Sequence, residues 1–239
     1  MAEDGFCGHW SAAVTVPDQR RRELQTSVVG PPASLNVRGR PGSFGIMKQA
    51  DWAEEIARKL LEIPLPRRWA HTEGVAAQAR SLAPMLGGDA DLLEAAAWLH
   101  DIGYSPDLVV TGFHPLDGAR YLRDFDDASD MLGRLVAHHS CAVIEAAERG
   151  LADELSREFA LPRRDLDDAL IYCDMTTGPD GQPLPVEARL ADIQARYGVR
   201  HLVSRSVRRA SPRLTEAVGT VGAMKAVAMP PQGHPGAQP

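Results

Sequence analysis

The sequence predicts an all-α protein with one helical domain between two polar tails. Apolar residues recur at helical spacing through most of the chain, and segments rich in Val and Ile with strand alternation are missing. Text rich in Gly and Pro gathers toward the two ends. With 239 residues, 44% of them hydrophobic, the chain can bury one sizeable core. We expect five or more helices packed around it.

Helix-start signals and apolar periodicity place the individual helices. Asp51 is expected to cap a helix over residues 52–62, Pro66 to open one over 67–86, and Asp89 or Asp91 to cap one over 91–100. Periodicity predicts the remaining helices at residues 114–125, 128–140, 142–159, 164–175 and 185–198.

The composition divides the chain into three parts. Residues 1–46 are rich in Gly, Pro, Ser and Arg without a sustained period, which predicts a disordered arm. The alternatives are a short regulatory arm and a translation start at Met47. Residues 47–210 form the predicted domain, and residues 211–239 are expected to be a helix remnant and a flexible tail.

Charge and cysteine usage exclude several classes of function. A formal net charge of −6 argues against nucleic acid as the main partner, and five arginines between residues 200 and 213 are interpreted as a solvated helix face. Cys7, Cys141 and Cys173 form no disulfide pattern and fit a reducing compartment. Because no apolar run of about 18 residues and no secretion signal occur, we predict a cytoplasmic protein without a membrane partner.

Several ionisable side chains fall on the apolar stripes of these helices. His71 lies in register with Val75, His100 continues the stripe of Ala96, and Asp174 follows Leu170, so all three should face inward. One inward histidine is usually a hydrogen-bonded core residue. Several such groups in one small domain would leave unsatisfied buried polar atoms unless they surround a cation.

The histidine doublet has one inward member by the same reasoning. His139 continues the stripe of Leu132, Leu135 and Val136, whereas His138 lies about 100° around the helix.

The order of these residues resembles the HD-domain superfamily of metal-dependent phosphohydrolases, over about residues 65–197. His71 stands in HTEGVAAQA, His100 and Asp101 stand in WLHDIG, and Asp174 stands in IYCDM. His114 in FHPLDGARYL and His138 in RLVAHHS are similar to the texts around the ligands of the two-metal branches, such as the symmetrical dinucleoside tetraphosphate hydrolases. The resemblance implies an all-helical fold.

The resemblance also implies a metal centre. It matches His71, His100, Asp101 and Asp174 to the ligands of a first metal, with Asp101 as a bridge, and it matches His114 and His138 to a second metal. His100 and Asp101 would also be catalytic. The role of His139 stays open. Two divalent ions, of Fe, Mn, Mg, Co or Zn, would provide a bound hydroxide for phosphoester or phosphoanhydride hydrolysis.

Two departures from the two-metal branches bear on the substrate. A lysine commonly follows HDxx, but this chain has Tyr104 there, which supplies no positive charge. The GYP text that follows the histidine pair of the HD-GYP phosphodiesterases is also missing. Candidates for the substrate site, besides Tyr104 itself, are Arg67 and Arg68 before His71, Arg120, Arg189, and Thr176 beside the last ligand.

Three functions follow from the resemblance. The leading hypothesis is a metal-dependent phosphohydrolase acting on a nucleotide or small phosphorylated metabolite. The alternatives are a two-iron HD-domain oxygenase and a non-catalytic sensor that binds a nucleotide. The oligomeric state is left open.

Overall fold

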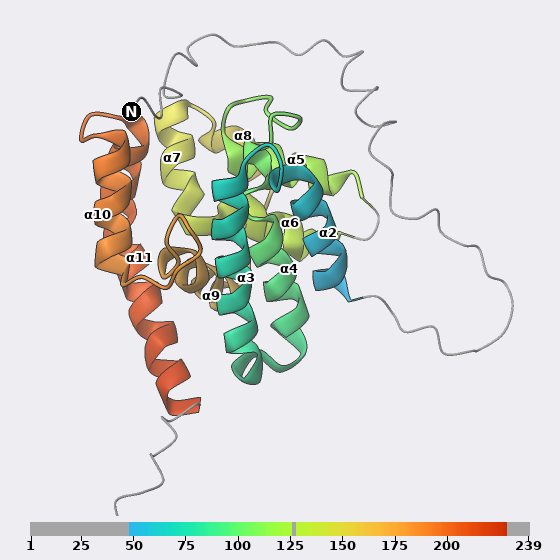
Figure 1. Cartoon of the computed structure of the whole chain (residues 1–239). Coiled ribbons are helices and arrows are strands. Elements are labelled where there is room, and N and C mark those ends of the chain that lie inside the picture. The colour runs from blue at the N-terminus through green and yellow to red at the C-terminus, as the bar shows by residue number, and fades with distance from the viewer. Residues whose placement is uncertain (1–47, 126–127, 229–239) are drawn as a thin grey trace, which may run out of the picture.

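The computed structural model describes residues 48–125 and 128–228, so the arm expected over residues 1–46 and the end of the C-terminal tail lie outside these ranges. The described chain is all-α, as predicted, and its helices pack as a bundle (Figure 1). The α-helices are α2 (Gln49–Leu61), α3 (Pro66–Leu86), α4 (Ala90–Leu99), α5 (His114–Arg123), α6 (Asp130–His138), α7 (Ala142–Arg149), α8 (Ala152–Glu158), α9 (Arg164–Met175), α10 (Val186–Tyr197) and α11 (Leu202–Ala228). Short 3₁₀ turns are η1 (Gly87–Asp89), η2 (Ile102–Tyr104) and η3 (His139–Cys141).

The predicted helix starts are confirmed in part. Pro66 occupies the first turn of α3, where its missing N–H costs nothing. Asp51 is not the N-cap of α2, which begins two residues earlier. The backbone N–H groups of Gln49 and Ala50 donate instead to the carboxylate of Asp91, at 2.9 and 3.3 Å. Asp91 therefore caps a neighbouring helix rather than its own.

The helix expected over residues 142–159 is two helices. Gly150 ends α7 with a φ of 73°, a left-handed conformation that glycine adopts without steric cost. Its backbone N–H donates to the carbonyls of Ala146 and Ala147. The chain then turns into α8, which carries the acidic residues that face α5.

The core lies where α4 packs against α2, α3, α6 and α9. In Figure 1, α2, α3 and α4 lie side by side. The main cluster includes fully buried leucines from several helices, namely Leu82, Leu93, Leu99, Leu116, Leu135 and Leu166. This packing fixes the ends of α3, α4 and α9 relative to one another.

The C-terminal helix α11 runs along α9 and α7 (Figure 1). A second, smaller cluster joins it to α9 and α10, with Ile171, Met175, Ala210 and Leu214 among its buried members. The domain boundary expected at residue 210 falls inside α11, which shows no break there and continues through Pro212. Among the described helices, none combines the length and apolar character needed to cross a membrane.

Two close backbone approaches hold loops against helices. A Cβ on Gly103 would lie 2.0 Å from the carbonyl oxygen of His114, so η2 touches the start of α5 directly. A Cβ on Gly74 would lie 2.4 Å from the carbonyl oxygen of Gly181, so the loop after α9 lies directly on α3. Only glycine fits either contact without moving the backbone.

Candidate functional site

One group of candidate ligands joins three helices. His71 comes from α3, His100 follows the last residue of α4, and Asp174 lies on α9. Each offers one ligand atom within 4.8 Å of the other two, and all three side chains are buried. The distance from Nε2 of His71 to Oδ1 of Asp174 is 3.1 Å. These residues are three of the four that the resemblance assigned to a first metal.

A second group forms beside the first. Asp101, His114 at the start of α5, and His139 in η3 also place their ligand atoms within 4.8 Å of one another. Nε2 of His114 is 3.3 Å from Oδ1 of Asp101 and 3.1 Å from Nε2 of His139. The structure thus brings a second His/Asp group against the first.

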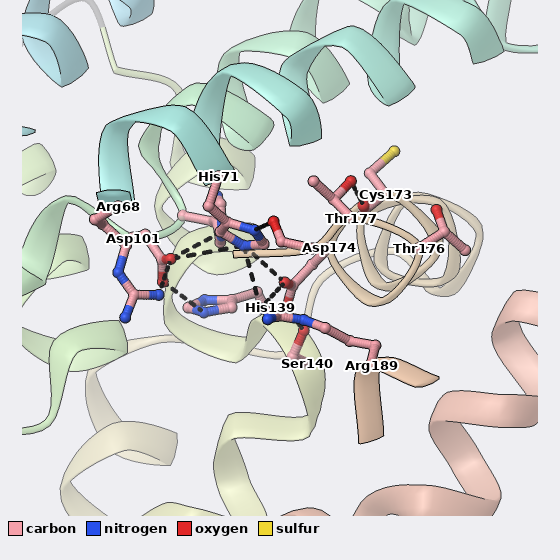
Figure 2. Close-up of polar contacts among 12 residues, drawn as sticks. Arg68, His71, Asp101, His139, Ser140, Cys173, Asp174, Thr176, Thr177 and Arg189 are labelled. Atoms are coloured by element: carbon pink, nitrogen blue, oxygen red, sulfur yellow. Dashed lines mark hydrogen bonds and ion pairs between the residues drawn. The ribbon is translucent and has the colours of Figure 1, made fainter. Parts of the chain in front are cut away.

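Asp101 lies between the two groups. Its Oδ2 is 3.3 Å from Nε2 of His100 and 3.9 Å from Nε2 of His71. Its Oδ1 is 3.3 Å from Nε2 of His114 and 3.9 Å from Nε2 of His139. One carboxylate oxygen therefore faces each group, as Figure 2 shows for the labelled members, Asp101, His71 and His139. This is the arrangement of a bridging carboxylate.

Backbone carbonyls orient three of the imidazoles. In each case Nδ1–H donates to a carbonyl oxygen and leaves the lone pair of Nε2 directed into the cluster, a tautomer inferred from the bond. The pairs are His71 with Gly178 at 3.0 Å, His100 with Ala97 at 2.7 Å, and His139 with Val136 at 2.7 Å. Such outer contacts are typical of metal-ligating histidines.

The buried nitrogens and oxygens fit a cation. Nε2 of His100 is buried and has no hydrogen-bond partner among the described residues, and Nε2 of His114 faces Nε2 of His139. Lone pairs that face one another or a carboxylate repel unless a positive charge lies between them. Imidazole nitrogen and carboxylate oxygen are common ligands of divalent transition metals. The residues present therefore fit the implied metal ions.

Protonation states support ligation for three of the imidazoles and for Asp101, whereas for His100 the Asp101 carboxylate outweighs the effect of burial and raises the pKa. Burial lowers the pKa of His71 and of His139, and it holds the pKa of His114 well below its usual range. Burial alone would raise the pKa of Asp101, but the charge of Arg68 and the contact between Asp101 and His100 hold that pKa well below its usual range. Neutral imidazole and ionised carboxylate are the forms that bind metal.

The structure does not place His138 in either group. Nε2–H of His138 donates to the carbonyl oxygen of Phe159 at 2.9 Å, and its Nδ1 is buried without a partner among the described residues. His139 occupies the place that the resemblance gave to His138. The chain leaves the helical path at this point, because Ser140 and Cys141 have φ of 50° and 62°. The apolar stripe of α6 had predicted that His139 faces the core.

Three residues expected at the substrate site lie elsewhere. Arg67 is exposed and pairs with Asp180 at 2.8 Å. Arg120 points to α8, where its Nε donates to Glu158 at 3.0 Å. The hydroxyl of Thr176 donates to the carbonyl of Tyr172 at 2.7 Å, and Figure 2 shows the side chain directed away from the cluster. None of the three lines the pocket beside the two groups.

Arg189 and Tyr104, also expected there, do line that pocket. Arg189 is buried on α10, and its Nη2 is 3.4 Å from Nε2 of His71 and 3.6 Å from Oδ1 of Asp174. Tyr104 stacks on His114, with ring centroids 3.9 Å apart. Figure 2 shows Arg189 directed toward the cluster.

Several lining residues were not expected from the sequence. Arg196 and Tyr197 end α10, and Val203 and Val207 come from α11. Ser140 donates a hydrogen bond to Oδ2 of Asp174. No motif marks these positions, because they approach the site through the packing of α10 and α11 on α9.

Comparisons with known proteins agree with this geometry. A family model described as HD domain matches residues 68–196, more than half of the chain. The chain belongs to the HD-domain family. Family membership and the two ligand groups indicate a metal-binding protein of the metal-dependent phosphohydrolase superfamily.

Curated relatives share part of this HD domain. Over 100 residues, the chain is 34% identical to Ribonuclease Y of Aliarcobacter butzleri (strain RM4018) and, equally, to Ribonuclease Y of Sulfurovum sp. (strain NBC37-1). Each match covers 41% of this chain and 20% of the relative, so the chain matches about one fifth of the length of these proteins. No solved structure matches significantly. The finer likeness to dinucleoside tetraphosphate hydrolases stays a prediction.

Proposed function

We propose that this chain is a metal-dependent phosphohydrolase that cleaves a phosphoester or phosphoanhydride bond of a nucleotide or small phosphorylated metabolite. The observation that carries the proposal is the position of Asp101, with one carboxylate oxygen toward each ligand group. His71, His100 and Asp174 would hold one divalent ion and His114 and His139 the other, with Asp101 between them. When bound, such a pair polarises a phosphoryl oxygen and lowers the pKa of bound water.

The state of the nearby cysteine and serine side chains favours attack by water rather than by a side chain of the protein. Burial raises the pKa of the Cys141 thiol to about 11, and burial also raises the pKa of Cys173, so neither is a thiolate at neutral pH. The Ser140 hydroxyl donates to Asp174 and has no histidine as general base among its described partners. His71, His100 and His139 would serve as ligands, because backbone carbonyls orient their rings.

The pocket supports a small substrate. Arg189 can donate to a phosphoryl oxygen from the side of Asp174, and an apolar wall from α11 offers room for an organic group. Three of the basic residues of α11 pair with acidic side chains. Arg205 and Arg209 pair with Glu148, and Arg213 pairs with Asp167 at 3.1 Å. Their pairing supports a solvated helix face rather than a nucleic-acid surface.

A hydrolysis screen, with the products separated by chromatography, tests the proposal. The full chain, loaded separately with Mn²⁺, Co²⁺, Mg²⁺, Zn²⁺ and Fe²⁺, would be assayed on mononucleotides, dinucleoside polyphosphates, sugar phosphates and a short RNA. We expect hydrolysis of at least one small substrate, and its loss with a chelator and in Asp174→Asn. Turnover of RNA alone would favour the activity named in the ribonuclease relatives. Oxygen uptake without phosphate release would favour the oxygenase alternative, and binding without turnover the sensor.

A further inference from the structure

The side chain of Arg68 brings a positive charge next to Tyr104, the residue at the position of the family's lysine. The guanidinium carbon of Arg68 is 4.0 Å from the ring centroid of Tyr104. The Tyr104 ring also stacks on the imidazole of His114, with ring centroids 3.9 Å apart. Nη1 of Arg68 also donates to Oδ2 of Asp101 at 2.7 Å (Figure 2). The residue at the lysine position carries no charge, but its ring holds an arginine beside the bridging carboxylate.

We infer that Arg68 binds the phosphoryl group of the substrate and that Tyr104 positions Arg68 for this task. The inference rests on the proposed function and names the phosphate-binding residue of that same site. A guanidinium presents several N–H donors in a fixed plane, which suits two phosphoryl oxygens. Stacking on an aromatic ring fixes that plane and leaves its edge for hydrogen bonding.

The surroundings of Arg68 favour a role in binding an anion. Its side chain lines the pocket and remains 22% exposed, whereas the carboxylate of Asp101 beside it is 5% exposed. Among the described residues, Asp101 is its hydrogen-bond partner, through Nη1 alone, so Nε and Nη2 keep donors for a ligand. Arg189 lies beside the other carboxylate, Asp174. The two guanidiniums therefore flank the two ligand groups from α3 and from α10.

The main alternative gives Arg68 a purely structural role. In that case the arginine only neutralises Asp101, and its removal would weaken metal binding without a separate effect on phosphate. An arginine elsewhere on α3 offers a matched control, because Arg80 also makes an ion pair and a cation–π contact. It is 2.6 Å from Glu94 and 5.6 Å from the ring of Trp98, outside the pocket.

The experiment uses the full chain loaded with Mn²⁺. The variants are Arg68→Met, Arg68→Lys, Tyr104→Ala, the double variant Arg68→Met with Tyr104→Lys, and the control Arg80→Met. Three quantities are measured for each: bound metal, the Kd of inorganic phosphate by calorimetry, and KM and kcat for 4-nitrophenyl phosphate.

We expect Arg68→Met to raise the phosphate Kd and the KM by about tenfold or more while bound metal stays at the wild-type level. Arg68→Lys should recover part of the loss, and so should the double variant, because it returns a cation to the lysine position. Tyr104→Ala removes the ring that holds the guanidinium and should also raise the phosphate Kd, whereas Arg80→Met, which lies outside the pocket, should stay near wild type.

Two results would overturn the inference. One is an unchanged phosphate Kd in Arg68→Met. The other is a loss of metal in that variant that accounts for its loss of phosphate binding. Failure of the proposed function looks different: a wild type that hydrolyses no phosphorylated compound, yet binds phosphate through Arg68, would remove the hydrolase assignment and leave this inference standing.

Discussion

Replacement of Gly103 by alanine should release one metal ion and leave the other. The added Cβ would lie 2.0 Å from the carbonyl oxygen of His114 and 2.7 Å from the backbone nitrogen of Gly118, whereas real Cβ atoms essentially never approach within 3.0 Å. The start of α5 must therefore move by about 1 Å or more. His114 is the first residue of α5, so its imidazole moves with the backbone.

The size of that displacement decides the outcome. Metal–ligand distances tolerate about 0.2 Å, so a shift of about 1 Å removes His114 as a ligand. Misplacement by about 1 Å near the reacting groups costs about 100-fold in activity. Overpacking of the close contact should lower the free energy of unfolding by about 1–3 kcal/mol, which leaves the fold intact. The first group should keep its ion, because none of its members, His71, His100 and Asp174, lies on α5.

The assay combines metal analysis, turnover and thermal unfolding. Gly88→Ala is the matched control, because no atom lies within 4 Å of a Cβ at Gly88. We expect Gly103→Ala to bind one metal ion fewer than the control and to lose about two orders of magnitude in turnover. Wild-type metal content and turnover in Gly103→Ala would refute the reasoning. Loss of both ions would also contradict it, since the clash would then have displaced the bridging carboxylate.

Further predictions address the rest of the site and the fold. Gly74→Ala should push the loop after α9 away from α3 and so break the hydrogen bond between His71 and the Gly178 carbonyl of that loop. The first group should then bind its ion more weakly, which competition with a chelator would measure. His139→Ala should lose metal and turnover while His138→Ala loses only stability, and equal metal loss in both would contradict the structure. Burial raises the pKa of Asp167 from 3.8 to about 6, so the folded protein binds that proton more tightly than the unfolded chain and stability falls as pH rises between these values. Asp167→Asn should flatten this slope. Well above pH 6 it should be more stable than wild type by about 3 kcal/mol in a urea titration, and an unchanged slope would contradict the prediction.

Periodicity alone predicted some of the ionisable residues that face the core, although others, such as Asp101 and His138, are also buried. His71, His100 and Asp174 lie on apolar stripes, and all three are buried. The stripe of α6 also indicated His139, whereas the resemblance indicated His138, and the structure agrees with the stripe. The family pattern fixes the order of ligands along a chain but does not decide which member of a doublet joins the ligand group, and here both members are buried.

The substrate side of the pocket depends on contacts that sequence spacing does not determine. Arg120 was expected there, but its partners are acidic residues of α8, about 35 positions away in the chain. Tyr197 and Val207 reach the pocket because α10 and α11 pack on α9 through the second apolar cluster. The length of α11 was also hidden, because Pro212 lies within it.

In the proposed site one carboxylate, that of Asp101, joins two metal ions. Manganese titration of the full-length protein, with metal analysis and electron paramagnetic resonance, tests it most directly. The wild-type chain should bind about two Mn²⁺ ions with a spin-coupled spectrum, and Asp101→Ala should lose the coupling and most of the bound metal. A single uncoupled Mn²⁺ ion per wild-type chain, unchanged in Asp101→Ala, would contradict it.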